Sequence, residues 1–170
     1  MENSKDKIII YIDAANIILF AKNINLDFNI FRLINKLKDK YRSEKVVYFT
    51  GRFKSMENYF LELQGSGVEL VFKEIYNENN KQKANCDVEI SRRITYDVDF
   101  NFVSKIILCS GDGDFAHILD FANSKNLEVK VVATDPKSCS RVIKRREFTK
   151  LSFITDFGDD VLNEKPPTST

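Results

Sequence analysis

The sequence predicts an α/β fold with a parallel sheet, from two patterns that run along the chain. Short apolar segments rich in Val and Ile alternate with segments of helical periodicity. The apolar segments are nearly continuous, which is typical of strands covered on both faces. With 170 residues, of which 43% are hydrophobic, the chain is long enough for one domain with a sizeable core. We expect that domain at residues 1–155 and a C-terminal tail at residues 156–170.

Each expected strand is a short run of apolar, mostly β-branched residues bounded by polar or turn residues. The first is the run Ile-Ile-Ile-Tyr-Ile, and the fourth is Lys-Ile-Ile-Leu-Cys. A helix stop, Gly65-Ser66-Gly67, leads into the third strand. The five strands are predicted at residues 8–12, 45–49, 68–72, 105–109 and 128–132.

Helices are predicted between these strands, where apolar side chains recur at spacings of three and four residues. The stripe of the first helix consists of Phe31, Ile34, Leu37 and Tyr41. The four helices are predicted at residues 28–41, 55–64, 87–96 and 115–125. The polar insert at residues 76–84 has no such stripe, and we expect it to be a mobile loop.

Composition excludes some classes of protein and leaves others open. Lys and Arg number 26 against 25 Asp and Glu, so the net charge gives no sign of nucleic-acid binding and any basic surface must be local. Three cysteines without CxxC spacing and a single histidine argue for reduced thiols and against a structural zinc site. No apolar run is long enough for a membrane span or a signal peptide. We therefore expect a cytoplasmic protein with no membrane partner.

Carboxylates follow two of the predicted strands. Asp13 comes directly after the first strand, and Asp112 and Asp114 follow the fourth. In a parallel α/β sheet, sites form beyond the carboxyl ends of the strands where the strand order reverses, so these side chains converge if the two strands are neighbours there. Like charges about 4 Å apart cost on the order of 4 kcal/mol at an effective dielectric constant of about 20. A divalent cation is the usual compensation.

Each of these acids also has an ordinary structural interpretation. Asp and Gly are common in strand-to-helix turns, and Asp114 could cap the helix that follows. Asp87 lies in the first turn of a predicted helix, where the helix dipole favours an acid by about 0.3–1 kcal/mol. Carboxylates at three strand or helix ends of one chain nevertheless favour a metal site, with Asp87 as a further ligand.

Three other polar residues lie near these acids in the sequence. Asn16 can orient Asp13 or a metal-bound water. Ser110 can hydrogen-bond Asp112 or a phosphate oxygen, or serve only as a turn hydroxyl. His117 lies one helical turn past Asp114, and a solvent-facing or packing role suits it better than that of a general acid.

Three blocks of sequence carry a family resemblance: Ile12-Asp-Ala-Ala-Asn16, Lys83-Ala-Asn-Cys-Asp87-Val88 and Ser110-Gly-Asp-Gly-Asp-Phe115. With a weaker match over residues 138–153, the chain resembles the NYN domains close to LabA-like proteins, within the PIN-like nuclease superfamily. The resemblance implies a three-layer αβα fold with a five-stranded parallel sheet in the order 3-2-1-4-5. Two departures are alanines where the first block often has glycine, and His117 where a proline is frequent.

The resemblance also implies a metal-dependent ribonuclease that uses Mg²⁺ or Mn²⁺. The implied metal ligands, which are also catalytic, are Asp13, Asp87, Asp112 and Asp114. Asn16 maps to a polar position beside the first aspartate, and Lys83 to a basic residue ahead of the helix acid. In this hypothesis Asp13 and Asp112 hold the principal ion, while Asp87 and Asp114 bind a second ion or position a water. The residues expected to contact RNA are Ser110, Lys83, Arg92, Arg93, Arg141, Lys144 and Arg145.

Two other functions stay open. A catalytically inactive domain could bind RNA or a protein partner through the same surface. A metal-dependent phosphatase would need an aspartyl nucleophile with a second acid two residues on, which Asp13 lacks and only the pair Asp112 and Asp114 supplies. At least half of the basic cluster at residues 141–146 is expected to be a solvated helix face, and a homodimer is also open.

Overall fold

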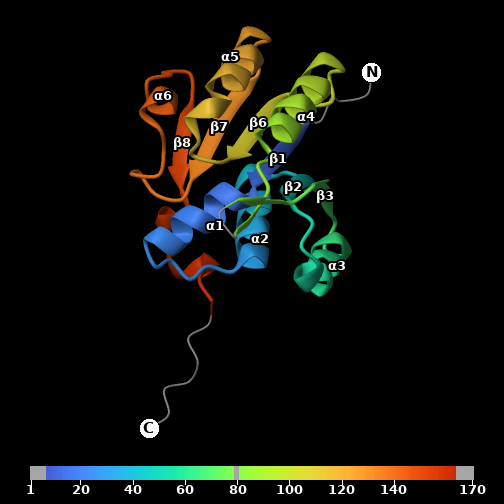
Figure 1. The fold of residues 1–170 in the computed structure, drawn as a ribbon. Coiled ribbons are helices and arrows are strands. Elements are labelled where there is room, and N and C mark those ends of the chain that lie inside the picture. Colours follow the sequence, from blue (N-terminus) through green and yellow to red (C-terminus); the bar gives the residue numbers. More distant parts are fainter. Residues whose placement is uncertain (1–6, 79–80, 164–170) are drawn as a thin grey trace.

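Six parallel strands form the central sheet of the protein (Figure 1). The computed structural model describes residues 7–78 and 81–163. The strand order is β3-β2-β1-β6-β7-β8, and each neighbouring pair is parallel. The strands are β1 (Ile8–Asp13), β2 (Lys45–Gly51), β3 (Val68–Lys73), β6 (Lys105–Cys109), β7 (Glu128–Ala133) and β8 (Lys150–Phe153).

This sheet confirms the predicted α/β fold and the order 3-2-1-4-5 of the five predicted strands. A sixth strand, β8, extends the sheet past β7, with Phe153 opposite Ala133. It has four residues and lies at an exposed edge, so its sequence has little of the apolar run that identifies the buried strands.

Helices cover both faces of the sheet and make the fold three-layered (Figure 1). The side chains of β1 alternate between the two cores. Ile9 and Tyr11 pack with α4 and α5, whereas Ile10 and Ile12 pack with α1 and α2. The helices are α1 (Ala14–Asn23), α2 (Ile30–Tyr41), α3 (Glu57–Gly65), α4 (Asp87–Asp99), α5 (Ala116–Ser124) and α6 (Arg141–Lys144). Short 3₁₀ segments are η1 (Lys54–Met56), η2 (Gly113–Phe115) and η3 (Ile154–Val161).

The polar insert at residues 76–84 is the clearest departure from the prediction. We expect a mobile loop there, whereas the structure has an antiparallel hairpin of β4 (Tyr76–Glu78) and β5 (Lys81–Lys83). Main-chain pairing holds such a hairpin together without the apolar alternation by which strands are predicted. The prediction of a loop was therefore wrong.

The packed chain continues beyond residue 155, where the tail was expected to begin. Phe157 and Val161 of η3 are buried in the same core as α2. Beyond them, Leu162 forms an isolated bridge with Phe28. The ordered domain thus extends at least to residue 163, while residues 164–170 lie outside the described part of the chain.

The membrane-spanning potential of the helices and the state of the cysteines can be examined in this fold. None of the helices in the described residues has both the length and the apolar character needed to cross a membrane. Cys86, Cys109 and Cys139 are free, as predicted, and all three are buried.

Candidate metal centre

The sheet brings the ends of β1 and β6 together at one edge. The two strands are paired, with Ile12 opposite Cys109, and each continues directly into the acidic segments singled out in the sequence. The strands that follow β1 in the chain, β2 and β3, lie on one side of it, whereas the later strands β6, β7 and β8 lie on the other side. The strand order therefore reverses between β1 and β6, which is where open α/β sheets form their binding sites.

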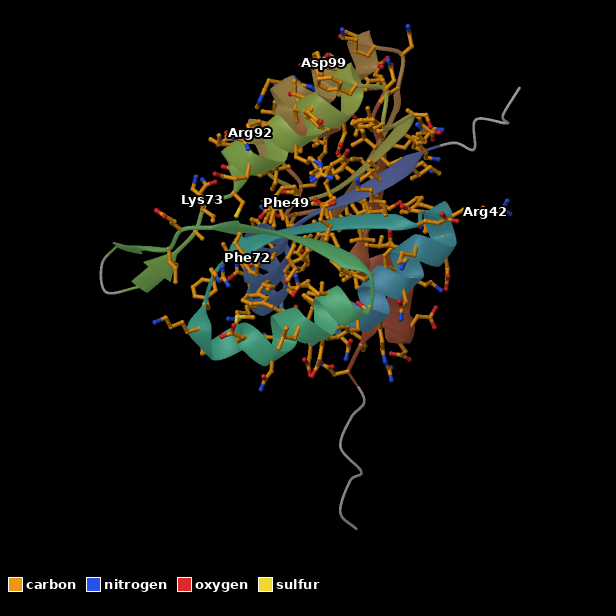
Figure 2. The ribbon with its side chains drawn as sticks, turned by 90° about the vertical axis from the view of Figure 1, so that its right-hand side faces the viewer. Arg42, Phe49, Phe72, Lys73, Arg92 and Asp99 are labelled. Atoms are coloured by element: carbon orange, nitrogen blue, oxygen red, sulfur yellow. The ribbon has the colours of Figure 1, made fainter. Side chains whose placement is uncertain are left out.

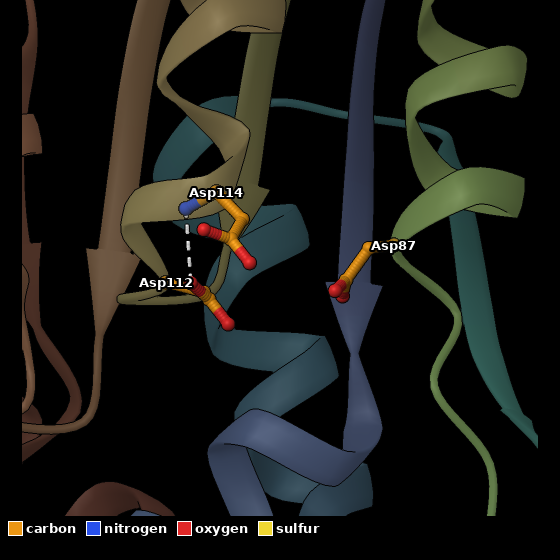
Figure 3. A group of neighbouring side chains, drawn as sticks. All are labelled: Asp87, Asp112 and Asp114. Carbon is orange, nitrogen blue, oxygen red and sulfur yellow. Dashed lines mark hydrogen bonds between the residues drawn. The ribbon is translucent and has the colours of Figure 1, made fainter.

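Three carboxylates meet at this edge (Figure 3). Asp87 points from the start of α4 across the end of β1 toward Asp112 and Asp114. One carboxylate oxygen from each residue lies within 4.8 Å of the other two. Asp87 and Asp112 are half-buried and Asp114 is exposed. No Lys or Arg side chain among the described residues lies within salt-bridge distance of them, so within that part of the chain their repulsion has no ion-pair partner to offset it.

Asp112 and Asp114, in the turn after β6, have different structural roles. The N–H of Asp114 donates to Oδ1 of Asp112 over 2.9 Å, so Asp112 caps the 3₁₀ turn η2. Asp114, for which a capping role was an open alternative, makes no such bond through its own carboxylate among the described residues. Its side chain is therefore available to a ligand, while Asp112 combines a cap with a free second oxygen.

The two glycines of this turn are required by close neighbours. A Cβ on Gly111 would lie 2.3 Å from the carbonyl oxygen of Ser138, and one on Gly113 would lie 2.6 Å from Oγ of Ser140. The N–H of Ser140 also donates to the carbonyl of Gly111 over 2.8 Å. The segment before α6 thus packs tightly on the turn and fixes the direction of its carboxylates.

Asp13 lies behind these three acids and is 4% exposed. Its Oδ1 accepts the N–H of Asn16 over 3.2 Å, and its Oδ2 accepts the hydroxyl of Ser110 over 3.0 Å. The pKa of Asp13 is raised to about 6, chiefly by burial and also by the charges of Asp87 and Asp112, although these two hydrogen bonds act to lower it. The structure therefore places Asp13 in the electrostatic field of the cluster, although not within the group of three.

Ser110 and Asn16 connect the elements of the site. Ser110 is fully buried, and its Oγ accepts the N–H of Asp112 over 3.2 Å while it donates to Asp13. Of the roles left open for Ser110, the structure supports the internal hydrogen bond, and burial excludes the predicted contact with substrate. Oδ1 of Asn16 accepts the N–H of Gly111 over 3.0 Å, so this amide joins α1 to the acidic turn.

The start of α4 positions Asp87. Oδ1 of Asn85 accepts the N–H of Asp87 over 2.8 Å and so satisfies a free donor of the first helical turn. Burial raises the pKa of Asp87, and the charges of Asp112 and Asp114 add to this effect. Burial also raises the pKa of the neighbouring Cys86 thiol to about 12, with Asp13 contributing, so Cys86 stays protonated and is no nucleophile.

Sequence reasoning missed Glu89 and Lys73. One oxygen of Glu89 pairs with Nζ of Lys73 at the end of β3, while its other oxygen is buried without a partner among the described residues. Glu89 follows Asp87 by two residues in the same helical turn. The acid was visible in the sequence, but its partner is brought to it only by the β3–α4 packing.

His117 agrees with its expected role, because it is exposed and its Nδ1 lies 2.6 Å from the carbonyl oxygen of Asp114. This contact holds the ring on its own helical turn. The structure thus gives no geometry that favours a general acid.

Arg93 belongs to a structural network instead of the predicted RNA surface. Its Nε donates to Oδ2 of Asp97 over 2.8 Å, and its Nη2 donates to Oε2 of Glu69 over 2.9 Å. The hydroxyl of Tyr11 donates to the same oxygen of Asp97 over 2.9 Å, and Asp97 is buried. This network joins α4 to β1 and β3, and we no longer assign Arg93 to RNA.

The remaining predicted basic contacts lie on both sides of the acidic turn. Arg141 and Arg145 are exposed at α6, directly after the segment that packs on Gly113. Arg92 is exposed on α4 (Figure 2). Lys144 donates to the carbonyl of Pro136, so this member of the cluster makes a structural contact, whereas a solvated helix face was expected for at least half of the cluster. The side chain of Lys83 lies outside the described part of the chain.

This donor set fits a hard divalent cation. The converging atoms are carboxylate oxygens, which are the ligands that Mg²⁺ and Mn²⁺ prefer. The cluster lacks a thiolate or imidazole ligand among the described residues, since Cys86 stays protonated and His117 contacts a carbonyl. Burial raises the pKa of Asp87, and the negative charges of Asp112 and Asp114 raise it as well. A cation of charge two would offset these negative charges.

Comparison with known proteins relates this arrangement to a family. The model of the NYN domain matches residues 7–152 of the chain. The crystal structure of a protein of unknown function from Vibrio parahaemolyticus has the same fold, with a TM-score of 0.76 and 22% sequence identity, covering 96% of this chain and 100% of the other. A search of curated proteins finds no match.

Proposed function

Because this chain belongs to the NYN domain family, we propose that it is a metal-dependent ribonuclease that hydrolyses phosphodiester bonds of RNA. NYN domains are part of the PIN-like nuclease superfamily. The observation that carries the proposal is the meeting of Asp87, Asp112 and Asp114 within 4.8 Å, without a compensating basic side chain among the described residues. Such a cluster is unfavourable by itself and becomes favourable when it binds a divalent cation.

We propose that these three carboxylates hold Mg²⁺ or Mn²⁺. A bound ion would lower the pKa of a coordinated water and stabilise negative charge on the phosphate. The chain's contribution is to fix the three carboxylates on two rigid elements, through the cap made by Asp112 and the bond from Asp87 N–H to Asn85. Such supporting contacts set ligand orientation and charge at metal sites.

We keep Asp13 as a fourth functional carboxylate, in a role distinct from the group of three. Its pKa of about 6 lies near neutrality, which suits a group that accepts a proton from an attacking water. Its bonds to Ser110 and to the N–H of Asn16 hold it in place behind the cluster. Direct ligation by Asp13, together with the two-ion arrangement, stays a prediction.

The proposed RNA path runs past the acidic turn between α6 and α4. Arg141 and Arg145 flank one side, and Arg92 is exposed on the other. Guanidinium groups bind phosphate oxygens in a bidentate manner, so these side chains suit a contact with the RNA backbone. The protein is proposed to be cytoplasmic, since three buried, free thiols are typical of a reducing compartment.

The test is cleavage of labelled RNA by purified protein in Mn²⁺, Mg²⁺ or EDTA. The decisive variant is Asp112→Asn, because asparagine can still accept the bond from Asp114 N–H and so keeps the cap. Asp156→Asn, an exposed acid on η3, is the matched control. We expect cleavage by the unsubstituted protein and the control in metal, and at least a hundredfold loss in Asp112→Asn and in EDTA.

Other outcomes identify the rival functions. Metal-independent RNA binding without cleavage would indicate an inactive binding domain. Hydrolysis of small phosphate esters but not of RNA would indicate a phosphatase. Cleavage that survives in Asp112→Asn would point to a contaminating nuclease and leave the proposal without support.

A further inference from the structure

A large basic pocket lies at the opposite edge of the sheet from the acidic cluster. Lys73 ends β3 at the carboxyl edge, whereas Arg42 precedes β2 at the amino edge, and Figure 2 shows the two at opposite sides of the molecule. The pocket has a volume of about 790 Å³, within the range of sites that bind small molecules or single nucleotides. Its cationic lining consists of Lys7, Lys40, Arg42, Lys45, Lys105 and Lys130.

The positive charge of this pocket is only partly compensated. Among the described residues, Glu44 is the one carboxylate in the lining, while Glu69 and Glu128 pair with lining lysines from just outside it. Even with these two counted, the six cations outnumber the carboxylates two to one. Burial lowers the pKa of Lys130, and the charge of Lys105 adds to the effect. The pocket therefore favours an anionic ligand.

An exposed aromatic cluster adjoins the pocket. Phe102 lines it, and the ring centroids of Tyr96 and Phe100 lie 5.8 and 6.1 Å from that of Phe102. Tyr96 and Phe100 are 4.6 Å apart. In the described part of the chain, several large hydrophobic side chains are exposed, and these three are the aromatic ones among them, with 44–59% of their surface exposed. Aromatic rings in water next to a cationic groove are a typical platform for unpaired bases.

We propose that this pocket and its aromatic cluster form a second RNA-binding surface, which takes single-stranded RNA by phosphate contacts and base stacking, apart from the acidic site. The choice of RNA among polyanions rests on the proposed function. Binding at this surface needs neither the metal nor cleavage. A bound strand would be held by the protein on the face that the acidic turn does not reach.

Two other occupants fit the same residues less well. A second copy of the chain would bring two sets of partly compensated cations, each with an excess of positive charge, together across a symmetric interface, and these would repel each other. An anionic membrane binds such side chains on a flat or convex face, whereas these cations surround a concavity of nucleotide size. Both remain as outcomes of the test.

The test measures binding of a fluorescein-labelled oligouridine of 20 nucleotides to the full chain carrying Asp112→Asn, in EDTA. This background removes cleavage, so the result is separate from that of the cleavage assay. One variant adds Lys7→Gln and Arg42→Asn. Asparagine tolerates the left-handed conformation of residue 42, where φ is 53°. A second variant adds Tyr96→Ala and Phe100→Ala, and a matched control adds Lys22→Gln and Leu61→Ala, which lie outside the pocket.

The charge variant should weaken binding and reduce the slope of log K against log salt by about 1.4, the value for two lost phosphate contacts on a single strand. The aromatic variant should lose about tenfold or more in affinity, as expected for a lost stacking contact. The control should bind as the background protein does. If the aromatic variant fails to fold, the charge variant decides alone.

Three results would overturn the proposal. The first is equal affinity of both variants and the control. The second is a dimer in sedimentation that the charge or aromatic variant dissociates, since the face would then be an interface between copies. The third is binding to vesicles containing phosphatidylserine, lost in the variants, without binding to the oligouridine.

Discussion

The Asp112→Asn substitution should stabilise the protein in EDTA and destabilise it, relative to the unsubstituted protein, in Mn²⁺. Oxygens of Asp112 lie within 4.8 Å of oxygens of Asp87 and Asp114. For one such pair, Coulomb's law gives roughly 3.5 kcal/mol at an effective dielectric constant of about 20 and roughly 0.9 kcal/mol in water. Because Asp114 is exposed and the other two are half-buried, solvent screening brings the repulsion close to the lower value.

The substitution removes this repulsion and leaves the shape of the turn intact. In the unsubstituted protein the N–H of Asp114 donates to Oδ1 of Asp112 over 2.9 Å, and the amide oxygen of asparagine can accept the same bond. A relief of about 1 kcal/mol corresponds to a rise in Tm of about 2–4 °C for a domain of this size. Bound metal favours the unsubstituted protein over the variant, since an ion at 100 times its Kd stabilises the folded state that binds it by about 2.7 kcal/mol. Asp112→Asn should lose most of that gain.

Thermal unfolding followed by circular dichroism, in EDTA and across a Mn²⁺ series, measures both effects. We expect the order of the two Tm values to reverse between the ends of the series, and Asp156→Asn to follow the unsubstituted protein throughout. The reasoning is refuted if Asp112→Asn is also the less stable protein in EDTA, or if Mn²⁺ shifts both proteins equally.

Three further predictions concern protonation, the tight turn and the buried network. The affinity for Mn²⁺ should fall as the pH drops below about 6, because protonation of Asp13 removes a negative charge beside the cluster. Burial also raises the pKa of Asp87, so protons compete with the ion at that ligand more strongly than at an ordinary aspartate. A titration by calorimetry with equal affinity at pH 5 and pH 8 would contradict this. Urea unfolding should show that Gly111→Ala lowers the free energy of unfolding by about 1–3 kcal/mol, because the added Cβ would meet a main-chain oxygen at 2.3 Å. Gly65→Ala in α3, where the added Cβ meets open space, should raise the free energy of unfolding by about 0.5–1 kcal/mol. Asp97→Ala should cost about 1–3 kcal/mol, because the buried hydroxyl of Tyr11 loses its acceptor and Arg93 keeps only Glu69 as a partner. The exposed Asp99→Ala should change stability by about 0.5 kcal/mol or less, and similar losses in both would argue against the network.

The strands and the acidic positions were predictable because their signals are local. A run such as Ile8–Ile12 can be buried only between two layers, and its strand type follows from that alone. The helix α1 was missed for an equally physical reason. Its N-cap is Asp13, whose side chain accepts the N–H of Asn16. In the sequence that aspartate was interpreted as a metal ligand or as a turn residue after the strand, so its capping role went unrecognised.

Long-range pairing explains most of what the sequence could not reveal. The partner of Ser110 lies 97 positions away at Asp13, and that of Arg93 lies 24 positions away at Glu69. An exposed arginine and one held by a buried carboxylate look alike until the fold places the partner. The same holds for the basic pocket, whose lysines come from the end of α2 and from four strands or their edges that are far apart in the chain.

The most direct measurement of the central claim is the position of a metal ion in a crystal grown in Mn²⁺, located by its anomalous scattering. The account predicts a peak about 2.1 Å from carboxylate oxygens of Asp87, Asp112 and Asp114. The peak should be absent from crystals of Asp112→Asn grown under the same conditions. A crystal of the unsubstituted protein that shows no anomalous peak at this edge of the sheet, although the three carboxylates keep their positions, would contradict the account.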